Sequence, residues 1–126
     1  IIVDEKEVFN MIIQIGNVDL KVSLVDNEAT RSLIERLKNG PITIAMNDYA
    51  KMEKVGDLGF SLPTDDKHTT TKSGDLILYL GHMFVIYYRP NTWNFTRLGT
   101  IENISDNQLQ DLLGKGDVVV TLLLEK

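Results

Sequence analysis

The stretch from Asp26 to Lys54 constrains the fold more than any other part of this chain. In sequence order it contains a capped amphipathic helix, a Gly-Pro stop, a buried strand and a dense polar loop. Strand-like segments precede and follow it. This arrangement indicates a mainly β domain in which one early helix plugs or covers the sheet.

The helix in this stretch has clear signals at both ends. Asp26 or Asn27 is the expected N-cap, because a short side-chain oxygen can accept the first free amide protons. Gly40-Pro41 follows its expected end, since glycine allows a left-handed cap and proline cannot continue a helix. Arg31 and Glu35 have the i,i+4 spacing of an ion pair on the exposed face. We therefore predict an amphipathic helix that stops shortly before Gly40.

Period-two alternation predicts strands on both sides of this helix. Residues 11–15 and 18–24 alternate in polarity, and Gly16-Asn17 between them is a hairpin turn signal. Residues 42–46 show the same alternation after the helix. We expect a hairpin with one solvated face, then the helix, then a buried strand.

The middle of the chain alternates between polar segments and apolar strands. Residues 47–59 and 64–73 are rich in polar side chains and are expected to be loops. Residues 76–80 and 83–89 predict a second hairpin around Gly81-His82. This hairpin is apolar on both faces, which is typical of strands that are covered on both sides.

The C-terminal part predicts a short strand, a second helix and a last strand. Residues 93–97 form the short strand, and Ser105 with Gln108 forms a capping box that begins the helix. Residues 118–124 are a continuous apolar strand. No repeat or linker interrupts the chain, so we expect a lead-in at residues 1–10 and one domain at 11–126.

Composition excludes several classes of function. The net charge of −5 and the scattered basic residues argue against nucleic acid as the main partner. Cysteine is absent, so disulfides and thiolate chemistry are excluded, and no apolar run approaches the roughly 20 residues of a membrane helix. The chain begins at Ile1 without an initiator methionine, which leaves open both the cytoplasm and export after removal of a signal sequence.

Several short motifs occur in a particular order between Met11 and Leu124. They are the hairpin at Ile15-Gly16, the helix start Asp26-Asn27-Glu28-Ala29-Thr30, Met46-Asn47-Asp48-Tyr49 with Glu53-Lys54, Leu62-Pro63, Ser73-Gly74-Asp75-Leu76-Ile77-Leu78-Tyr79, Ile86-Tyr87-Tyr88 and Leu98-Gly99-Thr100-Ile101. As an ordered set they resemble the bacterial cyclophilin-like family of small uncharacterised proteins.

The resemblance implies a closed, mainly antiparallel cyclophilin-like β-barrel with helices at its ends. Relatives of this kind also occur beside or fused to flavodoxin-like domains, which implies a flavodoxin-like redox protein as one partner. True cyclophilins isomerise X-Pro bonds with an arginine near the prolyl amide and an apolar pocket for the ring. Their phenylalanine-histidine-arginine signature and long Gly-rich segment are missing here, so no catalytic residue is carried over by position.

Arg89 and Arg97 are the candidates for a catalytic role in prolyl isomerisation. Each ends or follows an aromatic-rich segment, and one arginine donating to a twisted amide can lower its rotation barrier. The alternative is that both arginines lie at a rim and pack their stems on aromatic side chains.

A ligand site is expected where the polar segment after the buried strand meets the aromatic segment. Its candidate residues lie on the buried strand, in the polar segment after it or in the aromatic segment: Met46, Asp48, Glu53, Tyr87, Arg89 and Trp93. The alternative is a solvated turn with a surface ion pair. No metal-ligand spacing and no phosphate-binding glycine motif is present, so we expect neither a metal nor another cofactor.

Three hypotheses follow from these residues. The first is a non-catalytic binding or accessory module that takes a peptide or small ligand at a barrel-mouth pocket, with Glu53 as its polar anchor. The second is a peptidyl-prolyl isomerase with a degenerate site that uses Arg89 or Arg97. The third and weakest is a partner of a flavodoxin-like redox protein.

Overall fold

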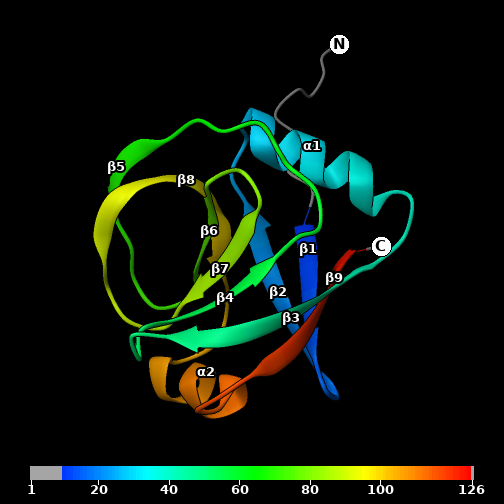
Figure 1. Cartoon of the computed structure of the whole chain (residues 1–126). Helices are drawn as coiled ribbons and strands as arrows, with labels where there is room; N and C mark the ends of the chain where they lie inside the picture. Colours follow the sequence, from blue (N-terminus) through cyan, green and yellow to red (C-terminus); the bar gives the residue numbers. More distant parts are fainter. Residues whose placement is uncertain (1–9, 126) are drawn as a thin grey trace.

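The computed structural model describes residues 10–125 and contains nine strands and two helices in that range (Figure 1). The expected lead-in at residues 1–10 lies outside the described residues except for Asn10, which begins the first strand. The elements in chain order are β1 (Asn10–Ile15), β2 (Val18–Leu24), α1 (Glu28–Leu37), β3 (Ile42–Tyr49), β4 (Glu53–Asp57), β5 (Lys67–Thr70), β6 (Asp75–Tyr79), β7 (Met83–Tyr87), β8 (Thr92–Ile101), α2 (Asp106–Leu113) and β9 (Val118–Leu124).

Eight strands close into an antiparallel barrel in the order β2-β1-β9-β3-β4-β7-β6-β8. The ring closes where β8 pairs with β2, and β5 is an additional strand on the first half of β8. Closure requires Gly99, because a Cβ there would lie 2.2 Å from the carbonyl oxygen of Ser23. The predicted closed barrel with two short helices is confirmed.

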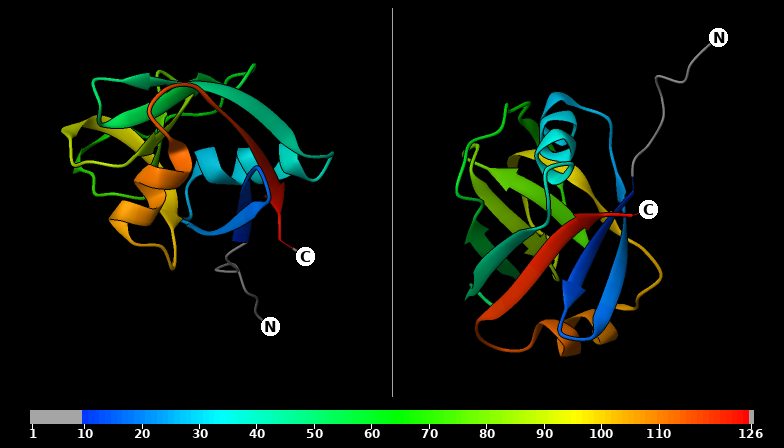
Figure 2. Two further views of the ribbon diagram at one scale, coloured as in Figure 1. Left: turned by 90° about the horizontal axis from the view of Figure 1, so that it is seen from below. Right: turned by 90° about the vertical axis from the view of Figure 1, so that its right-hand side faces the viewer.

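The interior of the barrel is filled with side chains and closed at both ends by helices. Figures 1 and 2 show α1 and α2 at opposite ends of the barrel. Leu33 of α1 and Leu109 of α2 are fully buried in the same apolar core as the inward-facing strand residues. An eight-stranded barrel has room either for its own side chains or for one small ligand, and here the buried core side chains fill it. A ligand site must therefore lie outside this interior.

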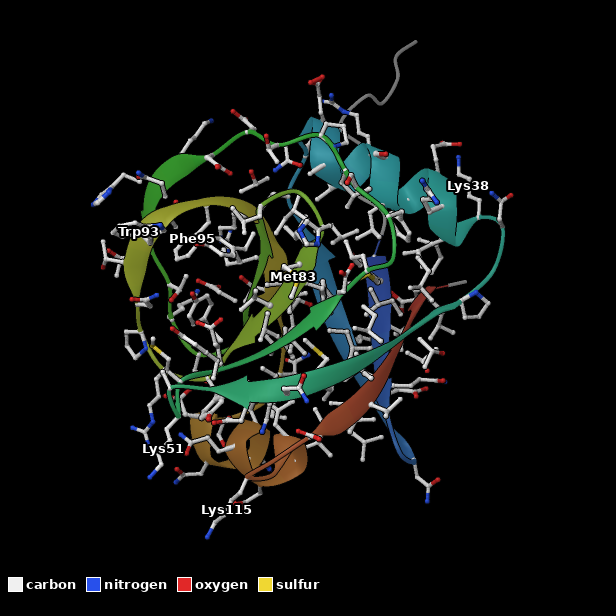
Figure 3. The ribbon with its side chains drawn as sticks, in the orientation of Figure 1. Lys38, Lys51, Met83, Trp93, Phe95 and Lys115 are labelled. Atoms are coloured by element: carbon white, nitrogen blue, oxygen red, sulfur yellow. The ribbon has the colours of Figure 1, made fainter. Side chains whose placement is uncertain are left out.

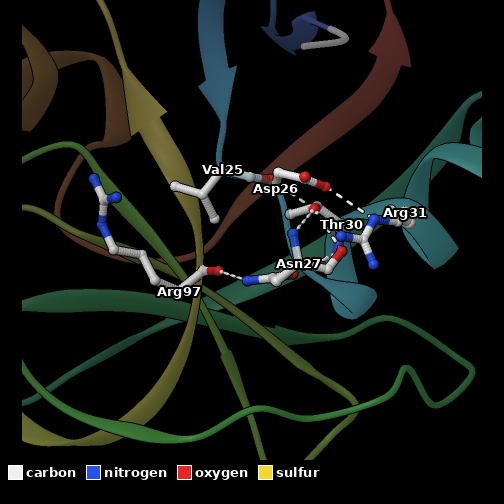
Figure 4. A network of polar contacts seen from close by, with 6 residues as sticks. All are labelled: Val25, Asp26, Asn27, Thr30, Arg31 and Arg97. Carbon is white, nitrogen blue, oxygen red and sulfur yellow. Dashed lines mark hydrogen bonds and ion pairs between the residues drawn. The ribbon is translucent and has the colours of Figure 1, made fainter. Parts of the chain in front are cut away.

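The start of α1 is fixed to β8 by the predicted cap (Figure 4). The Asn27 side chain accepts from the amide of Thr30 at 2.8 Å, and its Nδ2 donates to the carbonyl of Arg97 at 2.8 Å. The expected Arg31–Glu35 pair is not formed. Arg31 instead contacts Asp26 at 2.9 Å, because that carboxylate lies beside it in the turn before the helix.

Two predicted loops contain strands. Residues 47–59 form the end of β3, a tight turn and β4, where buried polar side chains hide the strand alternation. Residues 64–73 include β5, which contains no apolar residue because its side chains are mostly exposed. In residues 10–125, neither helix has the length and apolarity needed to cross a membrane.

Candidate functional site

The wall made by β4, β7 and β6 has apolar side chains on both of its faces. Because strand side chains alternate, one set points into the barrel and the other points away from it. The outward set forms a second, separate apolar cluster with residues of β8: Ile77, Val85, Tyr87 and Phe95, with Met52 and Val55 packed against them. The rings of Tyr87 and Phe95 lie 5.7 Å apart, so the first half of β8 is packed over the wall.

A pocket of about 600 Å³ lies over this outer face. Its aromatic lining consists of Tyr49, Tyr79, Tyr87, Trp93 and Phe95. Its aliphatic and thioether lining consists of Met52, Val55, Leu80, Met83 and Val85, and its polar lining consists of Glu53, His82 and Asn91. Figure 3 labels Trp93 and Phe95 on β8 and Met83 on β7.

The rim of the pocket concentrates exposed apolar side chains. Six large hydrophobic residues are exposed within the described part of the chain, and four of them line this pocket. They are Tyr49, Tyr79, Leu80 and Trp93, with Leu80 66% exposed and Trp93 58% exposed. A contiguous exposed apolar patch around a concavity is typical of a binding site.

One end of the pocket holds a hydrogen-bonded carboxylate. Glu53 is only 8% exposed, and burial raises its pKa above the usual 4.5 despite the hydrogen bond with Tyr87, which acts in the opposite direction. The charge of Asp48 adds to the increase in pKa. Burial also raises the pKa of Tyr87, so its hydroxyl stays protonated and donates to Glu53.

The polar end is held in place by the residue before β8 and by the segment before β6. Asn91 Nδ2 donates to the Tyr87 hydroxyl at 3.1 Å. The backbone of Asn91 is itself bound to buried Thr71, whose amide donates to the Asn91 carbonyl at 2.8 Å and whose hydroxyl accepts from the Asn91 amide at 2.9 Å. Glu53, Tyr87 and Asn91 therefore form a preorganised polar group within an otherwise apolar pocket.

A second polar network lies on the opposite, inward face of the same wall. Lys54 is completely buried, and its Nζ lies 3.2 Å from the Asp48 carboxylate and 2.5 Å from the carbonyl of Gly116. Tyr88 donates its hydroxyl proton to Asp48. Burial alone would raise the pKa of Asp48, but the hydrogen bonds from Tyr88 and Lys54 outweigh it and lower this pKa. Burial and the Asp48 carboxylate raise the pKa of Tyr88 to about 12. This network joins β3, β4 and β7 to the segment before β9.

Two tight turns at the pocket edge have backbone conformations that their residues rarely adopt. Ala50 and Lys51, between β3 and β4, both have φ of 55°, and Leu80, between β6 and β7, has φ of 56°. Positive φ costs energy for residues with a Cβ, and hairpin turns of this type favour Asn-Gly. Strain of this kind is concentrated at functional sites. Its position beside the pocket agrees with a functional constraint on both turns.

The predicted site residues fall into three groups. Glu53, Tyr87 and Trp93 line the pocket together. Met46 is buried in the barrel core and Asp48 belongs to the inward network, so neither lines it.

The two arginines form the third group, and neither lines the pocket. Arg89 is exposed at the end of β7. Arg97 lies 3.3 Å from the buried carboxylate of Asp75 and also donates to Thr100. The pocket itself lies on the outer wall, whereas the sequence had indicated a barrel mouth, because the helices and core side chains fill the ends of the barrel.

Several lining residues were not predicted from the sequence, among them Tyr79, Leu80 and Asn91. One signal for them was present. The hairpin of residues 76–80 and 83–89 is apolar on both faces, which requires a second apolar environment on the outer side of the barrel.

Comparisons with known proteins agree with this architecture. The chain belongs to the cyclophilin-like family, whose model matches residues 13–123. A hypothetical protein from Archaeoglobus fulgidus, whose structure was solved in solution, is similar with a TM-score of 0.67 and 15% identity over 93% of this chain and 95% of that protein. At this identity the likeness shows the fold alone. A search of the curated proteins finds no match.

Proposed function

We propose that this protein is a binding module that takes a peptide or small ligand in the pocket on its outer wall. The observation that carries the proposal is that, of the six large apolar side chains exposed within residues 10–125, four surround one concavity. An apolar pocket with a few oriented polar groups is the usual form of a ligand site, and this pocket has Glu53, Tyr87 and Asn91 in that role.

The lining favours binding over prolyl isomerisation. An isomerase needs an electrostatic group beside the twisted amide, and arginine was the expected one. Neither arginine of the aromatic segment reaches the pocket: Arg97 is bound to Asp75, and Arg89 is exposed at a strand end. A protease-coupled assay on X-Pro peptides should therefore show no acceleration. Acceleration that disappears in Arg97→Ala or Arg89→Ala would favour the isomerase instead.

Trp93 provides a direct test of binding, because it is the only tryptophan and it lines the pocket. Titration with the neutral probe 3-phenyl-1-propanol, and with short aromatic peptides, should change its emission until the site saturates. Val55→Phe should weaken this binding, since Val55 is a partly buried lining residue whose enlargement fills the pocket.

Val119→Phe is the matched control, because Val119 is exposed on β9 and does not line the pocket. The same substitution there should leave the titration unchanged. The proposal is overturned if neither the neutral probe nor the peptides give a saturable signal, or if both valine variants behave alike.

A further inference from the structure

We propose that the ligand of this pocket is an organic amine: an apolar body that carries a primary ammonium group, which contacts Glu53. This inference rests on the proposed function and specifies the ligand class. Five of the nine aromatic residues of the chain line the pocket together with one nearly buried carboxylate. Aromatic faces and a carboxylate are both complementary to an ammonium group.

At the Glu53 end, the charge of the pocket lining is negative. Among the residues that the structure describes, no lysine or arginine lines the pocket, and Glu53 is its one carboxylate. His82 lines the far end, beyond the stretch of β4 from Glu53 to Asp57, which spans roughly 13 Å at the usual rise of a strand. There His82 lies 3.3 Å from the Asp57 carboxylate. An anionic ligand would meet uncompensated repulsion beside Glu53.

The buried position of Glu53 explains why a cation is favoured. A carboxylate that is taken out of water loses hydration, and a single tyrosine hydroxyl replaces only part of it. A carboxylate offers about four lone-pair sites, so a primary ammonium can donate to those that Tyr87 does not use. A quaternary ammonium lacks N–H donors, and a neutral ligand leaves the charge uncompensated. The geometry therefore favours a primary amine.

The rest of the pocket fits the apolar body of such a ligand. Met83, Val85 and Phe95 are the more buried apolar lining residues, and the exposed Leu80 and Trp93 lie at the rim. The volume of about 600 Å³ lies within the range of small-molecule sites. An apolar body with a primary ammonium group is found in small organic amines and also in a protein segment that has a lysine beside an aromatic residue.

The test compares two probes of the same shape by Trp93 emission at neutral pH. 3-Phenylpropylamine is protonated there, because alkyl amines titrate near the lysine value of about 10.4, and 3-phenyl-1-propanol is its neutral counterpart. The amine should bind at least about tenfold more tightly, as a charge-assisted hydrogen bond predicts. Glu53→Gln should remove this preference, because glutamine keeps the size of the side chain and an acceptor oxygen but carries no charge.

Glu35→Gln is the matched control, since Glu35 is exposed on α1 and pairs with Lys38. It should leave both affinities unchanged. A blocked Lys-Phe dipeptide tests the source of the ammonium: tighter binding than the free amine assigns it to a protein segment, and weaker binding assigns it to a small molecule.

The outcomes separate this inference from the proposed function. Equal affinities for amine and alcohol in the wild type overturn the amine proposal and leave a binding pocket, and this comparison needs no variant to fold. A preference for the amine that persists in folded Glu53→Gln also overturns it. Absence of binding by any probe overturns the proposed function itself.

Discussion

Leu80 is the residue at which stability and binding should change in opposite directions. It lies in the turn between β6 and β7, has φ of 56°, is 66% exposed and stands at the rim of the pocket. The following Gly81 also has a positive φ of 81°. Leu80→Asn creates the Asn-Gly pair that such hairpin turns favour.

The expected gain in stability is the difference of two terms. A left-handed conformation costs an ordinary L-residue about 1–2 kcal/mol, much of which asparagine avoids. Full burial of a leucine contributes about 1.5–3 kcal/mol, so the third of Leu80 that is covered contributes about 0.5–1 kcal/mol, which the substitution loses. The net expectation is a gain of about 0–1.5 kcal/mol in the free energy of unfolding, with the middle of both ranges giving about 0.7 kcal/mol.

Urea unfolding should show this gain as a higher midpoint with an unchanged slope. Titration of the same variant with 3-phenylpropylamine should show weaker binding, because an apolar side chain is lost from the rim. Leu80→Ala is the matched control: it removes the same rim contact but keeps a Cβ at positive φ, so it should weaken binding without stabilising the protein. A destabilised Leu80→Asn, or unchanged binding in both variants, would refute this reasoning.

Three further predictions concern the two polar networks and the closure of the barrel. The raised pKa of Glu53 means that its ionised form is costly in the folded protein, so wild-type stability is lost as the pH rises through that pKa. Glu53→Gln should therefore be more stable than wild type at neutral pH but not near pH 4, as measured by urea unfolding at both pH values. Lys54→Met should cost about 3 kcal/mol, since it leaves a partly buried carboxylate without its cation, whereas Lys38→Met in an exposed pair should cost less than about 1 kcal/mol by the same measurement. Gly99→Ala should lower the free energy of unfolding by about 3 kcal/mol, because the added Cβ clashes with β2. Gly116→Ala is the control and should change the free energy of unfolding little, because a Cβ there meets open space. Similar thermal midpoints for the two alanine variants would contradict the closure argument.

The elements that were predictable from the sequence depend on local signals. Asn27 and Ser105 both form the capping boxes that fix the starts of α1 and α2. The first hairpin shows its alternation directly because one of its faces is solvated. A local pattern was sufficient for these elements, since the partners lie within a few residues of each other.

The parts that were missed depend on contacts between residues far apart in sequence. The local sequence around Lys54 is typical of a loop, yet Lys54 is in a strand and its ammonium group donates to the carbonyl of Gly116, 62 residues further on. Asp48 likewise accepts from Tyr88, 40 residues further on. Buried polar side chains of this kind break the alternation that identifies a strand.

The candidate site was predictable only in part, because its residues also come together from distant parts of the sequence. Glu53 and Trp93 were chosen because polar and aromatic residues at strand ends are typical of sites. That they line one pocket with Tyr79 and Leu80 depends on the curvature that brings β8 over the outer wall, and no local pattern encodes that curvature.

The most direct measurement of the central claim is nitrogen-15 chemical-shift mapping with 3-phenylpropylamine. If the outer pocket is the binding site, saturable shifts should appear at the backbone of Glu53 and Tyr87 and at the indole N–H of Trp93. Lys54, on the inward face of the same strand, should shift less than Glu53. Shifts confined to another surface, or no saturable shift at all, would contradict the claim that this pocket binds the ligand.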